Sequence, residues 1–142
     1  MLDIKFVRDN QAAVAEAMEN RHASWDAARF SELDETRRAA IAKEEALQAE
    51  RNAASKSIGA MMGAGQKDEA EAAKERVRAI NDELAVIGKE REAADEALRE
   101  LLLATPNMPA DSTPVGESEN DNPEVRRWGT PRDFAAEGFE MK

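Results

Sequence analysis

The sequence predicts an all-α protein: short N-terminal helices, a long antiparallel two-helix coiled-coil hairpin and a mostly irregular C-terminal connector. Ala, Glu, Lys, Leu and Arg supply more than half of the 142 residues, a composition typical of long helices and coiled coils. All five prolines lie after residue 105. In the proline-free part, apolar residues recur at alternating spacings of three and four, which is the period of a coiled-coil seam.

The composition excludes several classes of protein and site. The chain has no Cys, so it forms neither a disulfide framework nor a thiolate zinc site. Its single histidine, His22, cannot supply a multi-histidine metal site. No apolar run approaches the roughly 20 residues that cross a bilayer, and the N-terminus lacks the apolar core of a signal peptide. We therefore expect a cytoplasmic protein with no membrane partner and no metal site in this chain.

Residues 1–24 are expected to form a short helical prelude. Asn10 is a candidate N-cap, because its side-chain oxygen can accept a hydrogen bond from a backbone amide of the first turn. Apolar residues then recur at helical spacing, at Ala13, Val14, Ala17 and Met18. We expect a second apolar group to pack against this helix, made of Leu2, Ile4, Phe6 and Val7. A break is expected at 20–24, with Ser24 or Asp26 capping the next helix.

Residues 25–103 are predicted to form the hairpin, starting with a helix at 25–62. One heptad position of this helix is apolar throughout, at Leu33, Ala40, Leu47, Ala54 and Met61. The partner position is partly polar, at Phe30, Arg37, Glu44, Arg51 and Ile58. Each glycine in a helix interior costs about 1 kcal/mol relative to alanine. The three glycines Gly59, Gly63 and Gly65 therefore predict a turn at about 63–67.

The second helix of the hairpin is predicted at 68–103, where the pattern is clearest. Its stripe alternates spacings of three and four and is apolar except at Arg91: Ala70, Ala73, Val77, Ile80, Leu84, Ile87, Arg91, Ala94, Leu98 and Leu101. Each helix is roughly 50 Å long at 1.5 Å per residue. Because the turn is short, the two helices are expected to bury their stripes on each other.

A turn near residue 65 fixes the expected register, in which the numbers of facing residues sum to about 131. Arg91 would then lie within reach of Glu44 and could form an ion pair with it. The expected apolar pairs are Leu47 with Leu84, Ala54 with Val77, and Leu33 with Leu98.

The segment 104–142 is predicted to be a connector. It is rich in Pro, Gly, Asn, Asp and Ser, which are turn-forming residues. Its apolar content is too low for it to fold alone. One short piece, VRRW at 125–128, has the character of an edge strand.

No catalytic constellation is found in the sequence. His22 lies beside Arg21 in an expected loop and has no nucleophile partner, so a solvated loop residue is the simpler interpretation. The glycines match neither a phosphate-binding loop nor a dinucleotide fingerprint, because no strand precedes them. We expect no catalytic and no cofactor-binding residue in this chain.

The charge is distributed unevenly along the hairpin. The overall net charge of −10 argues against general nucleic-acid binding, which requires clustered Lys and Arg. Residues 51–78, however, contain six basic and four acidic side chains, and no acid occurs between Arg51 and Lys67. A mildly basic outer half suits an arm that meets an anion. Ordinary surface ion pairs, such as Glu71 with Arg78, are the alternative explanation, and Arg51 could equally be a packing residue of the seam.

Several motifs, in order, resemble the N-terminal region of bacterial seryl-tRNA synthetases. MLDIKFVRDN at 1–10 is similar to the start of that family, and LDETRR at 33–38 resembles the start of its arm. AERNAASKSIG at 49–59 resembles the arm signature, with Arg51, Asn52, Ser55, Lys56 and Gly59 at the recurring positions. LLLATPNMP at 101–109 resembles the exit from the arm, and TPVG with NPEVRRWGTPRDF, ending at Phe134, resembles the passage into the catalytic domain.

The resemblance implies a function that periodicity does not. In this family the hairpin binds the long variable arm and elbow of serine tRNA, and the enzyme is a homodimer. The full-length enzyme, a class II aminoacyl-tRNA synthetase, attaches serine to tRNA through a seryl-adenylate, using ATP and magnesium. No class II motif occurs in these 142 residues, so this chain is expected to bind tRNA without performing the chemistry.

The resemblance and the charge pattern together give the candidate tRNA-binding residues: Arg51, Asn52, Ser55, Lys56, Lys67, Lys74, Arg76 and Arg78. The alternative is a coiled-coil structural or adaptor protein that pairs with another helix through its partly polar seam. The seam pattern alone favours neither function.

Overall fold

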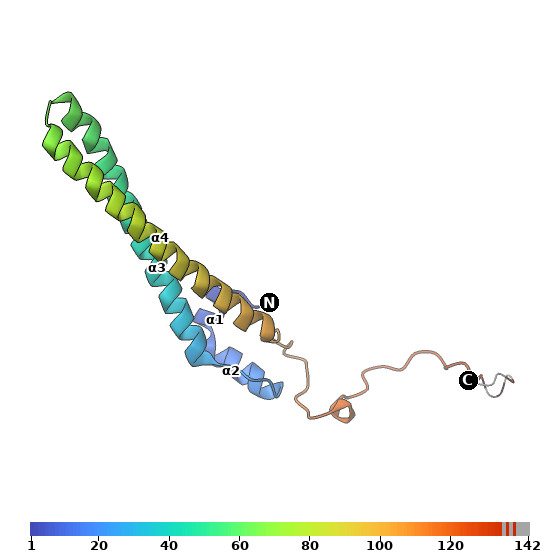
Figure 1. The fold of residues 1–142 in the computed structure, drawn as a ribbon. Helices are drawn as coiled ribbons and strands as arrows, with labels where there is room; N and C mark the ends of the chain where they lie inside the picture. The colour runs from blue at the N-terminus through green and yellow to red at the C-terminus, as the bar shows by residue number, and fades with distance from the viewer. Residues whose placement is uncertain (135, 137, 139–142) are drawn as a thin grey trace. The chain divides into compact units, whose positions relative to one another are not determined.

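The computed structural model describes residues 1–134, 136 and 138, and confirms the all-α class. Two short helices, α1 (Ile4–Asp9) and α2 (Gln11–Asn20), precede two long ones, α3 (Ala27–Gly63) and α4 (Lys67–Ala104). The long helices run side by side as an antiparallel hairpin, with α1 and α2 at its base (Figure 1). Residues 1–109 and 110–142 are separate compact units.

The base of the hairpin holds the larger of two apolar clusters. Its buried members come from α1, α2 and the inner ends of the long helices: Leu2, Val7, Val14, Ala17, Met18, Phe30, Leu33, Leu98 and Leu102. The expected packing of Leu2, Ile4 and Val7 against the short helix is confirmed. For Phe6 it is wrong, because that ring is 40% exposed. The short helices thus anchor the hairpin at one end.

The helix caps agree only partly with expectation. Asp26 caps α3 by accepting a hydrogen bond from the Arg29 amide at 2.8 Å. Asn10 stands at the N-cap of α2, but its side chain makes no capping hydrogen bond. Its amide instead donates to the Phe6 carbonyl at 2.8 Å, which ends α1. The prediction of a capping Asn10 side chain is therefore wrong, because the preceding helix uses that side chain.

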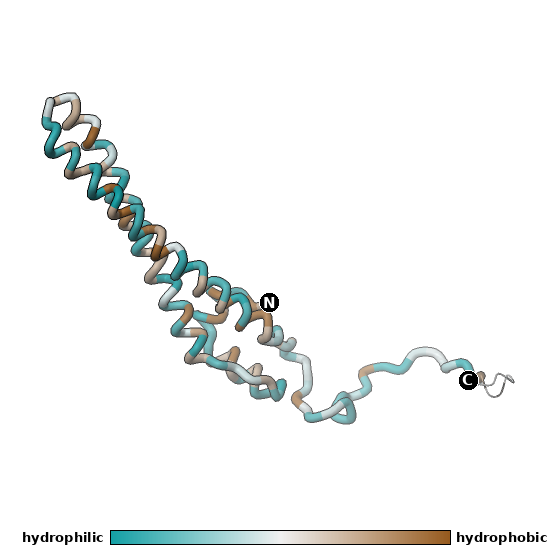
Figure 2. Tube along the Cα trace, viewed as in Figure 1, coloured by the Kyte–Doolittle hydropathy of each residue, from teal (hydrophilic) through white to brown (hydrophobic). Residues whose placement is uncertain are grey.

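The seam of the hairpin follows the predicted stripes. Ala40, Leu47, Ile80 and Ile87 form a second buried cluster, and Leu84 packs against it. Leu33 and Leu98 share the base cluster, as the register predicts. Figure 2 shows hydrophobic residues recurring between hydrophilic ones along both long helices. Each helix therefore contributes a narrow apolar stripe, and the faces outside it remain polar.

The turn between the long helices lies at 64–66, within the predicted range. Gly65 has φ +79°, a left-handed conformation that glycine adopts without the steric cost of a side chain. Gly59 and Gly63 remain inside α3. The ten residues 57–66 carry no charge, so the end of the hairpin is uncharged.

The second unit contains little regular structure. A 3₁₀ helix at Glu119–Asp121 is its one helical element among the described residues. The expected strand at 125–128 is wrong: that segment is extended without strand pairing, and Val125 is 94% exposed. A β-branched and aromatic composition favours strands, but a strand forms only where a partner strand supplies hydrogen bonds.

Candidate nucleic-acid interface

The eight candidate residues lie together on the outer half of the hairpin. Arg51, Asn52, Ser55 and Lys56 belong to the last turns of α3. Lys67, Lys74, Arg76 and Arg78 belong to the first turns of α4. The antiparallel packing therefore brings two segments of the sequence side by side. A heptad pattern can predict this juxtaposition, because the position of the turn fixes which residues lie side by side.

Three of the six candidate cations have no counter-ion. Among the described residues, no hydrogen bond or ion pair engages the side chains of Arg51, Lys56 or Lys67. Lys56 and Lys67 are exposed, whereas Arg51 is half-buried at the seam. No carboxylate occurs in the sequence between Arg51 and Lys67. These three cations are therefore available to an external anion.

The other three candidate cations form ion pairs on the hairpin surface. Lys74 lies 2.6 Å from Glu71, and Arg78 lies 2.9 Å from Glu75. The hydrogen bond from Lys74 lowers the pKa of the Glu71 carboxyl, which is consistent with an ion pair. The alternative of ordinary surface ion pairs therefore describes these two basic residues, although Arg78 pairs with Glu75 and not with the expected Glu71.

Arg76 differs from the other cations because it joins the two helices. Its Nε lies 2.7 Å from Glu50 on α3, and its Nη1 lies 3.6 Å from Glu83 on α4. The hydrogen bond from Arg76 lowers the pKa of the Glu50 carboxyl. The expected register did not indicate this pair, because the two residue numbers sum to 126 and not to about 131.

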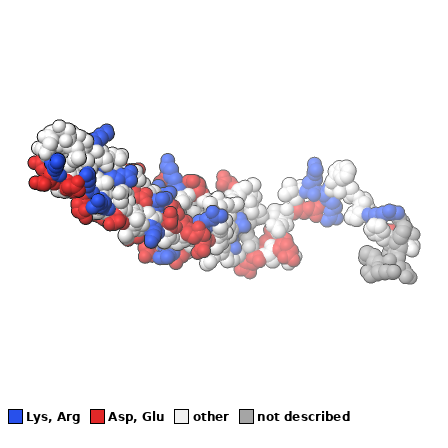
Figure 3. All heavy atoms as spheres, turned by 45° about the horizontal axis from the view of Figure 1, so that its top comes forward, with Lys and Arg blue, Asp and Glu red and all other residues white. Residues whose placement is uncertain are grey.

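The uncharged candidates Asn52 and Ser55 are both exposed. Within the described part of the chain, neither side chain makes a hydrogen bond. An exposed amide and hydroxyl without internal partners can donate to or accept from a ligand. Figure 3 shows an end of the hairpin that is largely free of charge, with basic and acidic side chains mixed along its length.

In the inner half of the hairpin, several charged residues pair with one another. Arg91 donates to Glu44 at 3.1 Å, which confirms the predicted pair, and also to Asp95 at 3.3 Å. Arg37 on α3 donates to the same Asp95. At the base, Arg8 donates to both carboxylate oxygens of the buried Asp34, at 2.6 and 2.7 Å. These pairs satisfy the polar positions of the seam and of the base.

The described residues contain no group of three or more metal-ligating side chains that could hold an ion. His22 is exposed in a turn with φ 53° and has no catalytic partner. None of the helices described here has the length and apolarity that a membrane span requires.

Comparison with known proteins identifies the family. A family model described as the seryl-tRNA synthetase N-terminal domain matches residues 1–109. Among similar proteins, the serine–tRNA ligase of Neisseria meningitidis serogroup C is 46% identical over 142 residues, which is 100% of this chain and 32% of that protein. The serine–tRNA ligase of Francisella tularensis subsp. novicida is 42% identical over 137 residues, covering 96% of this chain and 32% of that protein. This chain spans about a third of the length of these relatives, and it belongs to the family of seryl-tRNA synthetase N-terminal domains.

Proposed function

We propose that this chain is the tRNA-binding arm of a serine–tRNA ligase and that its hairpin recognises the long variable arm of serine tRNA. The observation that carries the proposal is the outer half of the hairpin. There, Arg51, Lys56 and Lys67 have no counter-ion among the described residues, and no acid lies between them in the sequence. The family match and the names of the relatives suggest that the anion bound by these cations is tRNA.

The physical form of the hairpin suits this ligand. Double-stranded RNA is recognised mainly by its shape and backbone, because its deep major groove is hard to read. A long, thin helical hairpin with few cations can therefore detect where an extra stem projects. Few phosphate contacts predict modest affinity that falls steeply with salt. A second anchor elsewhere in a full-length enzyme would raise the effective concentration of the arm.

The chemistry of the whole protein is part of the same proposal. A cytoplasmic, homodimeric ligase would attach serine to tRNA, using ATP and magnesium. No step of that reaction is assigned to the described residues. Their role is to bind and orient the tRNA.

A coiled-coil adaptor is less well supported. That function needs polar seam residues that are available to a partner helix. Arg37, Glu44 and Arg91 are instead engaged within the hairpin, through mutual contacts and contacts with Asp95. The polar seam residues of α3 are thus already paired with α4 and are not available to another helix.

A binding measurement tests the proposal. Fluorescence anisotropy of this chain at low salt would compare serine tRNA with the same tRNA carrying a shortened variable arm. We expect the intact tRNA to bind roughly tenfold tighter, a difference of about 1.4 kcal/mol. Equal affinity for both RNAs would contradict recognition of the long arm. Dimers joined along the hairpin, with no RNA binding, would favour the adaptor.

A further inference from the structure

We infer that the tRNA is held along one edge of the hairpin only, the edge that carries Gln48, Asn52, Ser55, Lys67, Lys74 and Asn81. This set is called the polar edge. The opposite edge carries Lys43, Glu50, Glu69, Arg76, Glu83 and Glu90 and is called the acidic edge. The inference rests on the proposed function and adds which face of the hairpin the RNA meets.

Helical periodicity separates the two edges. In a heptad, the positions that flank the seam lie on opposite sides of it, and every seventh residue returns to the same side. Lys67, Lys74 and Asn81 are such a series on α4, and Gln48 and Ser55 are its counterpart on α3. Asn52 lies one turn from both Gln48 and Ser55, so it shares their side of the helix.

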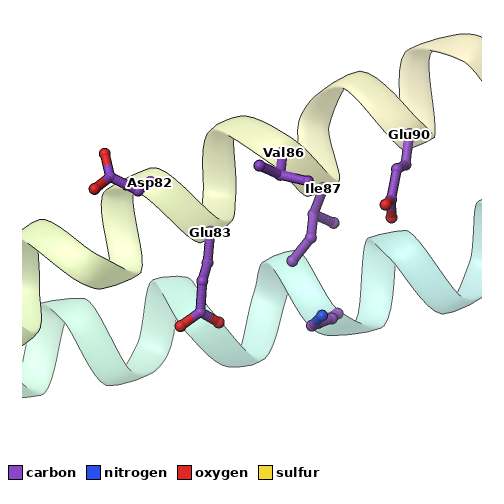
Figure 4. A pocket seen from close by; sticks show the side chains of 6 residues that line it. Asp82, Glu83, Val86, Ile87 and Glu90 are labelled. Atoms are coloured by element: carbon purple, nitrogen blue, oxygen red, sulfur yellow. The ribbon is translucent and has the colours of Figure 1, made fainter.

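Ion pairs show which residues share the acidic edge. Arg76 lies between Glu50 and Glu83, at 2.7 and 3.6 Å, so these three residues share one side of the seam. A groove on this side is lined by Lys43, Asp82, Glu83, Val86, Ile87 and Glu90. Figure 4 shows the Glu83 and Glu90 side chains directed toward α3, on either side of Ile87.

The acidic edge is unfavourable for RNA. Its groove has three carboxylates and one lysine around an apolar floor, in which Val86 is 58% exposed. Phosphates brought to this side would meet uncompensated negative charge, and like charges brought together cost several kcal/mol. Arg76 is already paired with two carboxylates here, and we do not expect it to contact the RNA, although charge alone made it a candidate.

The polar edge has the opposite character. The side chains of Gln48, Asn52, Ser55 and Asn81 are exposed, and none of them hydrogen-bonds to another described residue. Amides and hydroxyls can bind both phosphate oxygens and ribose hydroxyls. Lys74 is paired with Glu71 at 2.6 Å, whereas Lys67 has no counter-ion among the described residues, so this edge offers hydrogen-bond donors and one unpaired cation.

The polar edge is available only in the outer half of the hairpin. Closer to the base, the same side carries Asp34, Asp95 and Leu102. Asp34 binds Arg8 of α1, and Asp95 binds Arg37 and Arg91. Leu102 is fully buried in the base cluster. The inner part of this edge is therefore occupied by the protein itself, which restricts RNA contact to the outer turns.

Two adjacent substitutions test the inference, because Asn52 and Ala53 are both exposed and lie on opposite flanks of α3. Asn52→Asp adds a carboxylate beside the polar edge with almost no change of shape. Ala53→Asp adds the same charge on the side of the acidic edge. At physiological salt, exposed charges are screened beyond about 8 Å, which is less than the diameter of a helix. Each carboxylate therefore acts mainly on its own side.

The readout is the dissociation constant for serine tRNA, with circular dichroism confirming that both variants are folded. We expect Asn52→Asp to weaken binding roughly tenfold or more and Ala53→Asp to change it less than about twofold. Equal weakening, or greater weakening by Ala53→Asp, would overturn the edge assignment while the preference for a long variable arm remained. Loss of that preference in the unmodified chain would instead overturn the proposed function, and this inference with it.

Discussion

The ion pair between Arg8 and Asp34 attaches the short N-terminal helices to the hairpin. Both carboxylate oxygens of Asp34 accept hydrogen bonds from the Arg8 guanidinium, and Asp34 is 3% exposed. The hydrogen bond from Arg8 lowers the pKa of the Asp34 carboxyl, although burial opposes this shift. Because the charged form of Asp34 is favoured in the folded state, the pair stabilises the fold at neutral pH.

We predict that Asp34→Asn lowers the free energy of unfolding by about 2 kcal/mol at pH 7, since a charged hydrogen bond is lost beside a half-buried guanidinium. The lowered pKa of Asp34 means that the stabilisation is complete above about pH 4 and is lost as the pH falls through the folded-state pKa. Thermal unfolding of both proteins from pH 7 to pH 3 would show the difference shrinking in acid.

Glu35→Gln is the matched control for this prediction. Glu35 is the neighbouring carboxylate, is exposed, and has no ion pair with any residue in the described part of the chain. Its loss should change stability by less than about 0.5 kcal/mol. A constant difference between Asp34→Asn and the unmodified chain across this pH range would show that the carboxylate charge is not what stabilises the base.

The sequence predicts contacts within the hairpin better than contacts made by the short helices. The ion pair between Arg91 and Glu44 follows from the heptad register, because the turn fixes which residues face each other. The ion pair between Arg8 and Asp34 depends on how α1 packs on α3. No sequence periodicity extends across the break between these two helices, so the pair could not be predicted. The competition for the Asn10 side chain has the same origin, since two adjacent helices share one residue at their junction.

At the level of elements, the hairpin depends on a short apolar seam. The second buried cluster has four buried side chains, two of which are the isoleucines Ile80 and Ile87. Charged residues interrupt it, because Glu44 lies between the cluster members Ala40 and Leu47 in the sequence and meets Arg91 of α4 across the seam. A core this thin tolerates little loss of volume, because each removed side chain is a large fraction of the buried surface.

Substitutions at two adjacent residues of α4, Val86 and Ile87, test whether the hairpin depends on its apolar seam. Ile87 is 3% exposed in the seam, whereas Val86 is 58% exposed in the acidic groove. We predict that Ile87→Ala destabilises the hairpin by about 3 kcal/mol and that Val86→Ala changes its stability by less than about 0.5 kcal/mol. Helical circular dichroism during thermal unfolding measures both. Equal shifts would mean that the apolar stripe does not hold the hairpin together.

The helices could be predicted from the sequence because each contains its own pattern, with a seam stripe and glycines near the end. The expected range 68–103 differs from the observed α4 by a single residue at each end. The segment 125–128 could not be predicted in the same way. Strand character in four residues is only a tendency, and pairing depends on a neighbouring strand that the described residues do not supply.

At the scale of the whole molecule, the net charge of −10 is distributed unevenly along the chain. Acidic residues prevail outside residues 51–78, and the inner seam positions are engaged in ion pairs. Cations without a counter-ion among the described residues occur in both halves, for example Lys56 and Lys67 in the outer half and Lys43 and Lys89 in the inner half. Composition can predict this gradient along the chain, but the division into two edges requires the contacts of Arg76, which depend on the packed register.

A double-mutant cycle tests directly whether the outer half of the hairpin meets the long variable arm. One change is Lys56→Ala with Lys67→Ala, which removes two exposed lysines without counter-ions. The other is the shortening of the variable arm of serine tRNA. Lys43→Ala with Lys89→Ala, two exposed lysines of the inner half, is the matched control for lost charge.

We predict that the outer pair of substitutions weakens binding of the intact tRNA roughly tenfold and hardly affects the shortened one. This corresponds to a coupling free energy of about 1 kcal/mol or more between the lysines and the variable arm. The inner pair should show a coupling near zero. Equal losses on both RNAs from the outer pair, with no coupling, would contradict the assignment of the outer half of the hairpin as the surface that recognises the long variable arm.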